Sequence, residues 1–232
     1  MSTQSLSSLS FVFPMYNEIE NIEPCIKGTL SIAEKLGIDC EIVVVNDAST
    51  DGCGELAERL AEEIPEVKVF HHEKNRKLGG TLRTGFYGAT KDYILYMDSD
   101  LPLDFNDVAE AIPKIGDADV LIGFRLTRDE PFKRKVLSFG YNSLIRVLFG
   151  LKVKDVNFSF KLFKREILEK ITLTSEGSFI DAELLIEARK AGYRIVQVGL
   201  PYHPRIAGES TLASTSVIKK TFEEMGTYFF KR

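Results

Sequence analysis

Short apolar runs alternate with amphipathic stretches along the first half of the chain. The apolar runs are continuous, and they cover residues 9–13, 40–45, 67–71, 93–97 and 119–124. Apolar residues at helical spacing lie between them, at about residues 18–36, 54–64, 80–89 and 106–115. Continuous apolar runs are typical of strands that are covered on both faces. The repeated strand–helix order therefore predicts an α/β fold with a doubly wound, mostly parallel central sheet, in which Pro14 ends the first strand.

The pattern changes after about residue 125. A helical stretch, a strand-like stretch, a helix, a strand and an irregular loop follow at residues 130–149, 156–163, 180–191, 194–198 and 199–213. We therefore predict one domain over residues 1–232. It would comprise a Rossmann-like, nucleotide-binding half at about 9–124, a second half at about 125–213, and an amphipathic C-terminal helix at 214–232.

Composition and charge narrow the class of protein. The 232 residues carry a formal net charge of -4, which argues against a nucleic-acid-binding protein. Three cysteines without metal spacing suggest reduced thiols in a cytosolic protein. The first ten residues lack the basic and apolar regions of a signal peptide, and no apolar run approaches the ~18 residues of a spanning helix. We expect a cytoplasmic protein.

Polar side chains follow three of the predicted strands at the point where each strand ends. Asp98 and Asp100 come directly after the strand at 93–97. The other two groups are Tyr16, Asn17 and Glu18 after the first strand and Asn46, Asp47 and Asp51 after the second. Functional groups of open α/β sheets gather at the carboxyl ends of the strands. Carboxylates two residues apart in an extended segment face the same side, so they can converge on one Mg²⁺ or Mn²⁺ ion that also holds substrate phosphates.

Each of these groups also has an ordinary structural explanation. An Asp-Ser-Asp triplet is common in turns and helix caps, and "NDASTDG" can be a turn that caps the next helix. Gly79 and Gly80 can cap a helix or let the backbone approach a ligand. His71 and His72 have no partner at metal spacing, which favours surface or loop positions. The functional interpretation rests on all three polar groups falling at the same end of the predicted sheet.

The order of the motifs resembles a known enzyme family. The chain contains, in sequence, "FPMYNE", "VVVNDASTDG", "NRKLGGTLRTGF", "YMDSDLP", "IGFR" and "RIAGES". This series resembles the family 2 glycosyltransferases with a GT-A fold, and it is most similar to the branch of dolichyl-phosphate mannose synthases and polyprenyl-phosphate glycosyltransferases. The resemblance extends from about residue 9 to residue 212.

The resemblance implies donor-binding roles for matching positions. These are Pro14, Tyr16, Glu18, Val45, Asp47, Asp98, Ser99, Asp100, Arg125 and Arg205. Asp98 and Asp100 match the pair that holds Mg²⁺ or Mn²⁺ on the donor diphosphate, and Asp47 matches the acid that hydrogen-bonds the base. Metal ions and arginines are also the usual means of stabilising a departing diphosphate, whatever the family. Arg125 and Arg205 alone could equally form surface ion pairs.

The second half is then the acceptor side. Arg134 and Ser138 match positions that contact a lipid phosphate, and Asp155 matches an acid that precedes the family's "SGF" strand, here "FSF". The resemblance also implies inversion at the sugar's anomeric carbon. A hydroxyl acceptor would need a general base, for which Asp181 is the first candidate and Asp155 the second, whereas an attacking phosphate needs none. Asp181 could equally cap the helix that it opens.

Three positions depart from the mannose synthase pattern. Pro102 stands where these enzymes carry a Gln that can bind the metal, Thr211 replaces a Lys that follows "GES", and Ser159 replaces the Gly of "SGF". These differences leave the metal and the reaction class in place, and they weaken the identification of GDP-mannose as the donor.

We therefore expect an inverting, metal-dependent transfer of a sugar from GDP-mannose or a UDP-hexose to a polyprenyl or dolichyl phosphate. Two alternatives are transfer to a sugar hydroxyl in surface polysaccharide synthesis and a non-catalytic subunit that binds a sugar nucleotide. A lipid acceptor requires contact with the cytoplasmic face of a membrane, through a partner subunit that provides an anchor or through the C-terminal helix. In that helix Ile218, Phe222, Met225 and Phe229 form an apolar face beside basic residues. The same face could instead pack against the sheet.

Overall fold

The computed structural model describes residues 6–99, 103–126, 132–201 and 215–231. Its centre is a sheet in which the described residues form seven strands in the order β3-β2-β1-β4-β6-β5-β7. The strands are β1 (Ser8–Met15), β2 (Asp39–Asn46), β3 (Val67–His71), β4 (Tyr93–Met97), β5 (Val120–Arg125), β6 (Phe160–Lys164) and β7 (Ile195–Leu200). The helices are α1 (Ile22–Leu36), α2 (Cys53–Glu63), α3 (Lys77–Gly88), α4 (Phe105–Ala111), the 3-10 helix η1 (Ile112–Ile115), α5 (Phe132–Phe149), α6 (Ile167–Lys170), α7 (Ile180–Lys190) and α8 (Thr215–Phe230).

The sheet is mostly parallel, as predicted, with one reversed strand. The pairs β1–β2, β1–β4, β2–β3 and β5–β7 are parallel, whereas β6 runs antiparallel to both β4 and β5. Because β6 is reversed, Phe160 at its beginning pairs with Met97 at the end of β4. The carboxyl ends of β1, β2, β4 and β5 and the amino end of β6 therefore share one edge of the sheet.

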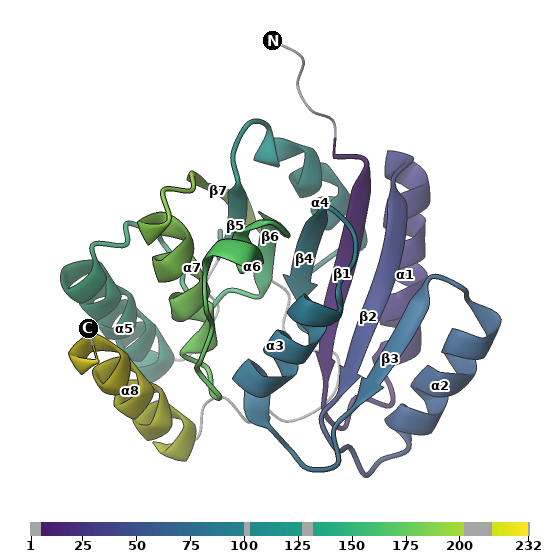
Figure 1. The fold of residues 1–232 in the computed structure, drawn as a ribbon, viewed down its shortest axis with the longest axis horizontal. Coiled ribbons are helices and arrows are strands. Elements are labelled where there is room, and N and C mark those ends of the chain that lie inside the picture. The colour runs from purple at the N-terminus through teal and green to yellow at the C-terminus, as the bar shows by residue number, and fades with distance from the viewer. Residues whose placement is uncertain (1–5, 100–102, 127–131, 202–214, 232) are drawn as a thin grey trace.

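Helices cover both faces of the sheet, which explains why the strands β1, β2 and β4 are buried along nearly their whole length. Figure 1 shows α3 and α7 on one face and α1 and α4 on the other. Alternate residues of one strand point to opposite layers: Phe11 and Phe13 pack in the layer of α1, α2 and α4, whereas Val12 packs in the layer of α3 and α7. All three side chains are fully buried.

The predicted elements agree with the observed ones, apart from a few boundaries. β3 and β4 have the predicted bounds, and Gly37 ends α1 in the left-handed conformation. The expectation that Pro14 ends the first strand is wrong, because β1 continues to Met15. The ladder between β1 and β4 stops at Val12, so Pro14 pairs with β2 only, where its missing N–H is tolerated. The first helix begins at Ile22 rather than near residue 18.

The apolar face of α8 packs against other helices. Tyr141 of α5 stacks edge-on against Phe222, and Phe149 of α5 contacts both Tyr228 and Phe229. Met225 is buried in the core layer that contains α7. The packing interpretation of this face therefore holds, although its partners are helices rather than the sheet. In the part of the chain that the structure describes, no helix is both long and apolar enough to cross a membrane.

Candidate active site

The shared edge of the sheet collects several of the described residues that the sequence singled out. Asp47 follows β2, Asp98 and Ser99 follow β4, and Arg125 ends β5. Asp155 lies shortly before β6, whose amino end reaches the same edge. Asp100 and Arg205 lie outside the described residues. Arg134 lies in α5, but its side chain is outside the described part of the chain.

The loops after β1 and β2 are joined by hydrogen bonds. The backbone N–H of Asn17 donates to Ser49 Oγ at 3.0 Å, and the N–H of Thr50 donates to Asn17 Oδ1 at 2.9 Å. Asp51 accepts from the N–H groups of Ile19 and Cys53, at 2.9 and 3.0 Å. Burial would raise the pKa of Asp51, but the hydrogen bonds from Cys53 and Ile19 outweigh it and lower the pKa. Asp51 thus orders the two loops and the start of α2, which is the ordinary structural explanation of "NDASTDG".

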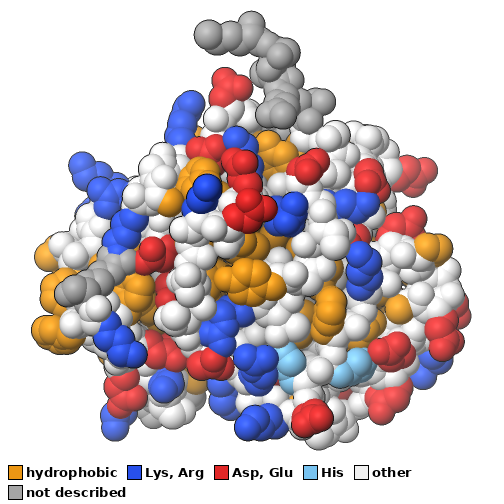
Figure 2. All heavy atoms as spheres, in the orientation of Figure 1, with side chains coloured by type: hydrophobic (Ala, Val, Ile, Leu, Met, Phe, Trp, Pro, Cys, Tyr) orange, Lys and Arg blue, Asp and Glu red, His pale blue; other side chains and the backbone are white. Residues whose placement is uncertain are grey.

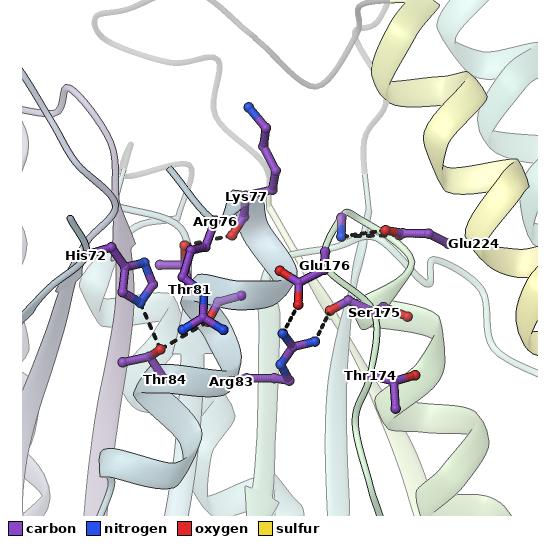
Figure 3. Close-up of polar contacts among 12 residues, drawn as sticks. His72, Arg76, Lys77, Thr81, Arg83, Thr84, Thr174, Ser175, Glu176 and Glu224 are labelled. Atoms are coloured by element: carbon purple, nitrogen blue, oxygen red, sulfur yellow. Dashed lines mark hydrogen bonds and ion pairs between the residues drawn. The ribbon is translucent and has the colours of Figure 1, made fainter. Parts of the chain in front are cut away.

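Asp47 belongs to a different network, which extends to the start of α3. Its Oδ1 atom lies 2.7 Å from His72 Nδ1 and also accepts from the backbone N–H of Arg76 at 2.7 Å. The other ring nitrogen of His72 lies 2.8 Å from Thr84 Oγ1 of α3. Figure 3 shows His72 directed at Thr84. His72 lies in the loop between β3 and α3, as expected, but it is not a surface residue, because its side chain is only 7% exposed.

The remaining predicted donor-pocket residues differ in exposure. The Tyr16 ring is exposed at the end of β1, and Glu18 is half-buried. Ser99 is buried and donates to the carbonyl oxygen of Pro14 at 3.0 Å, which ties the end of β4 to the end of β1. The Val45 side chain is fully buried in the core layer beneath α3.

Asp98 is linked through Tyr96 to the buried ion pair of Lys161 and Asp181. Its Oδ1 atom accepts from the Tyr96 hydroxyl at 3.0 Å. Lys161 of β6 lies over the Tyr96 ring, 5.3 Å from its centroid, and its Nζ atom lies 2.6 Å from Asp181 Oδ1. Lys161 Nζ also donates to the Phe158 carbonyl oxygen at 2.7 Å. Lys161 was not predicted as a site residue, although a lysine within the apolar stretch "FSFKLF" is a signal that could have identified it.

Burial dominates the electrostatics of Asp181. The side chain is enclosed, which raises its pKa, and the positive charge of Lys161 opposes that rise. The negative charges of Asp98 and Asp155 raise the pKa further. The alternative that Asp181 caps α7 is wrong, since Phe179 is the N-cap and no side chain caps the helix.

A second buried ion pair lies at the same edge. Arg125 Nη1 donates to Asp155 Oδ2 at 2.8 Å, and the guanidinium lies over the Phe158 ring. The two side chains are 10% and 1% exposed. The alternative that Arg125 forms an exposed surface pair is therefore wrong.

Gly79 and Gly80 fit a neighbouring loop closely. A Cβ atom on Gly79 would lie 2.2 Å from the Ser175 carbonyl oxygen, and both glycine N–H groups donate to the Glu176 carbonyl oxygen. Arg83 of α3 contacts the same loop through the Ser175 carbonyl and the Glu176 carboxylate (Figure 3). The absence of side chains at Gly79 and Gly80 therefore lets α3 pack closely against the loop that contains Ser175 and Glu176.

The chemistry of the edge fits a divalent cation. The described residues contain no group of three or more His, Cys, Asp or Glu side chains placed to hold a metal. Asp98 is half-buried at the end of β4 and offers a carboxylate, which is the ligand type that Mg²⁺ and Mn²⁺ prefer. A site with one or two protein carboxylates suits an ion that takes its other ligands from water and substrate phosphates.

Comparison with known proteins identifies relatives of this chain. Residues 10–172 match the model of the family described as "Glycosyl transferase family 2". Glycosyltransferase AglD of Haloferax volcanii is 32% identical over 85% of the chain, and the match spans 33% of AglD. The chain thus spans about a third of the length of that relative. Polyprenol monophosphomannose synthase of Mycolicibacterium smegmatis is 31% identical over 91% of the chain and 83% of its own length.

Solved structures show the same fold. Glucosyl-3-phosphoglycerate synthase from Mycobacterium tuberculosis, in complex with Mn²⁺ and uridine-diphosphate-glucose, superposes with a TM-score of 0.72 and 18% identity. The superposition covers 96% of this chain and 78% of that one. The predicted GT-A fold is confirmed.

Proposed function

The chain belongs to glycosyl transferase family 2, and on this basis we propose that it transfers a hexose from a nucleoside-diphosphate sugar to a polyprenyl phosphate. The observation that carries the proposal is that Asp47, Asp98 and Arg125 lie along one edge of the sheet, at the ends of β2, β4 and β5, in a chain related along 91% of its length to a polyprenol monophosphomannose synthase. The sugar is left open, because one relative's name specifies mannose and the superposed structure holds a glucose donor.

We assign the donor to the ends of β1, β2 and β4. Asp47 would accept a hydrogen bond from the base, and the exposed Tyr16 ring offers a surface for stacking. Asp98, together with Asp100, would hold Mg²⁺ or Mn²⁺. When bound, that ion neutralises charge on the departing diphosphate. Arg125, fixed by Asp155, brings a positive charge to the same edge.

The burial of the two candidate bases favours a phosphate acceptor. Asp181 and Asp155 are 4% and 1% exposed, and each is ion-paired with a cation. A general base must reach the proton that it removes, whereas a phosphate monoester attacks without one. We propose that a lipid phosphate attacks the anomeric carbon in line and inverts it. Ser138 and Arg134 of α5 are its proposed contacts, and Asp181 and Asp155 hold the cations in place.

The proposed acceptor requires contact with a membrane surface. α5 carries exposed apolar side chains at Val136, Leu137 and Phe139, next to the proposed acceptor position Ser138. Figure 2 shows hydrophobic side chains gathered at the end of the molecule formed by α5 and α8, with Lys and Arg side chains beside them. We propose that this end lies on the cytoplasmic face of the membrane, with or without an anchoring partner subunit.

A transfer assay tests the function. Purified protein is given UDP- and GDP-sugars, a polyprenyl phosphate or a soluble sugar acceptor, and Mn²⁺, Mg²⁺ or a chelator. We expect a preference for one of the nucleotide sugars, metal-dependent glycosylation of the lipid, and loss of at least a hundred-fold in activity in Asp98→Asn and Asp100→Ala. Asp117→Ala is the matched control, because Asp117 is exposed in the loop before β5, at the opposite edge.

Three outcomes would change the assignment. Full activity in Asp98→Asn would overturn the metal assignment. Transfer only to the soluble sugar would support polysaccharide synthesis, and donor binding without transfer would support a non-catalytic subunit.

Vesicle co-sedimentation tests the membrane contact. Binding to anionic vesicles is expected to fall as salt rises, because the contribution of basic residues is screened within about 10 Å at 0.1 M salt. Phe139→Ser is expected to weaken binding, whereas Tyr87→Ser, which changes another exposed aromatic ring, on α3, serves as the control. Equal binding by both variants would contradict the proposed orientation.

A further inference from the structure

His72 is held at three points beside Asp47. Its backbone N–H donates to the Asn46 carbonyl oxygen at 2.9 Å, which continues the pairing of β3 with β2. One ring nitrogen lies 2.7 Å from Asp47 Oδ1 and the other 2.8 Å from Thr84 Oγ1. The histidine ring therefore bridges the end of β2 and the body of α3.

The chemistry of the carboxylate fixes the direction of the first hydrogen bond. An ionised carboxylate only accepts, so His72 Nδ1 carries the proton and donates to Asp47. The second nitrogen is anchored to Thr84, whose hydroxyl also contacts the Gly80 carbonyl oxygen at 3.2 Å. The ring has little freedom to rotate, because both of its nitrogens are engaged and its side chain is buried.

The donors converge on one carboxylate oxygen. His72 Nδ1 and the Arg76 backbone N–H both contact Asp47 Oδ1, and across the described residues these two are the hydrogen bonds that the Asp47 carboxylate accepts. A carboxylate held at one oxygen by two fixed donors presents its other oxygen in a defined direction. That geometry suits a base that offers a ring N–H, as uracil and guanine do.

We propose that His72 is a positioning residue that orients the Asp47 carboxylate for recognition of the nucleotide base. The inference rests on the proposed function, because it takes Asp47 as the acid that binds the base. His72 itself touches neither the diphosphate nor the sugar in this assignment. Its loss should therefore weaken binding of the nucleoside diphosphate and discrimination among bases, while turnover at saturating donor changes little.

Two substitutions separate positioning from general packing. The amide nitrogen of Asn can occupy the place of His Nδ1, whereas that of Gln reaches the place of Nε2. We expect His72→Gln to weaken binding of the preferred nucleoside diphosphate, measured by calorimetry, by about ten-fold to a hundred-fold, as expected for a hydrogen bond to a charged group. His72→Asn should retain most of the affinity. Thr84→Val removes the anchor and should weaken binding by a few-fold.

His71→Asn is the matched control, because this neighbouring histidine is 42% exposed and contacts Asn46 and Glu58 rather than Asp47. Binding of UDP, GDP, CDP and ADP by each variant gives the base discrimination, and steady-state kinetics separate KM from kcat. Equal losses in His72→Asn and His72→Gln, or a fall in kcat with KM unchanged, would overturn the positioning role. A wild-type protein that binds none of the four diphosphates would instead overturn the proposed function, and this inference with it.

Discussion

Two buried carboxylates at opposite edges of the sheet have their pKa values shifted in opposite directions. Glu41 lies near the amino end of β2 and Asp181 at the start of α7, close to the carboxyl edge; both are almost fully buried. Burial by itself acts to raise the pKa of both groups. For Glu41, hydrogen bonds from Lys68, Ser10 and Thr90 outweigh burial and lower the pKa to about 2. For Asp181 burial wins and the pKa is raised.

The difference lies in the number of donors that surround each group. Glu41 accepts from the Ser10 hydroxyl at 2.6 Å, from Lys68 Nζ at 2.5 Å, and from the hydroxyl and backbone N–H of Thr90. Asp181 has the single cation Lys161 among the described residues, and two further carboxylates lie near enough to raise its pKa. A fully satisfied buried charge stabilises the fold, whereas an incompletely satisfied one marks a site where the fold carries an electrostatic cost.

Breaking the Lys161–Asp181 pair should have the largest effect. Lys161→Met leaves the Asp181 carboxyl buried without its cation, and such losses cost about 3–5 kcal/mol. We expect the free energy of unfolding, measured with urea, to fall by that amount. Adding Asp181→Asn should recover most of the loss, because the neutral amide leaves no uncompensated charge in the core.

The double variant also tests whether the pair serves the site. Lys161 lies over Tyr96, whose hydroxyl holds Asp98, so we expect the double variant to regain stability without regaining sugar transfer. Recovery of both would show that the pair is only structural. If Lys161→Met alone were as stable as the wild type, the inference that Asp181 is an incompletely satisfied buried charge would be contradicted.

Removing the charge at the other edge should cost somewhat less. Glu41→Gln turns one acceptor oxygen into a donor that faces other donors, and it leaves Lys68 without its partner. We expect unfolding by urea to show a loss of about 1–3 kcal/mol. Activity per folded molecule should change less than two-fold, because Glu41 lies at the edge away from the site. A large fall in kcat would show that the two edges are coupled.

Acid should remove the contribution of Glu41. The folded-state pKa of about 2 lies below the ordinary value of 4.5, so this contribution is complete above pH 4.5 and is lost as pH falls toward 2. The stability difference between wild type and Glu41→Gln should therefore shrink over this window, by on the order of 2 kcal/mol. Urea unfolding of both proteins at several pH values measures it, and a difference that is independent of pH would contradict the lowered pKa.

The smallest effect should come from one neutral donor. Ser10→Ala removes one hydrogen bond to Glu41 and leaves its other donors, so we expect a loss of about 1 kcal/mol. Ser7→Ala, at an exposed position just before β1, is the control and should leave the melting temperature unchanged. A loss as large as that of Glu41→Gln would show that Ser10 acts beyond its hydrogen bond.

Local patterns in the sequence determined most of the elements and the edge where the site lies. Apolar runs marked β3 and β4 to the residue, and polar groups after β1, β2 and β4 placed Asp47 and Asp98 at one edge. These inferences succeed because burial on both faces and parallel strand direction leave a periodic or positional trace in a single stretch of chain.

Tertiary structure decided what these residues touch. His72 meets Asp47 across 25 positions of the sequence, and the reversal of β6 brings Lys161 behind Asp98. The apolar face of α8 packs against α5, which the spacing of its residues could not decide. The pattern of residues along the chain indicates whether a side chain is buried or polar. The residue that this side chain contacts lies on a distant segment, and only the packed fold sets the position of that segment. For the same reason two buried acids, Glu41 and Asp181, differ in the sign of their pKa shift.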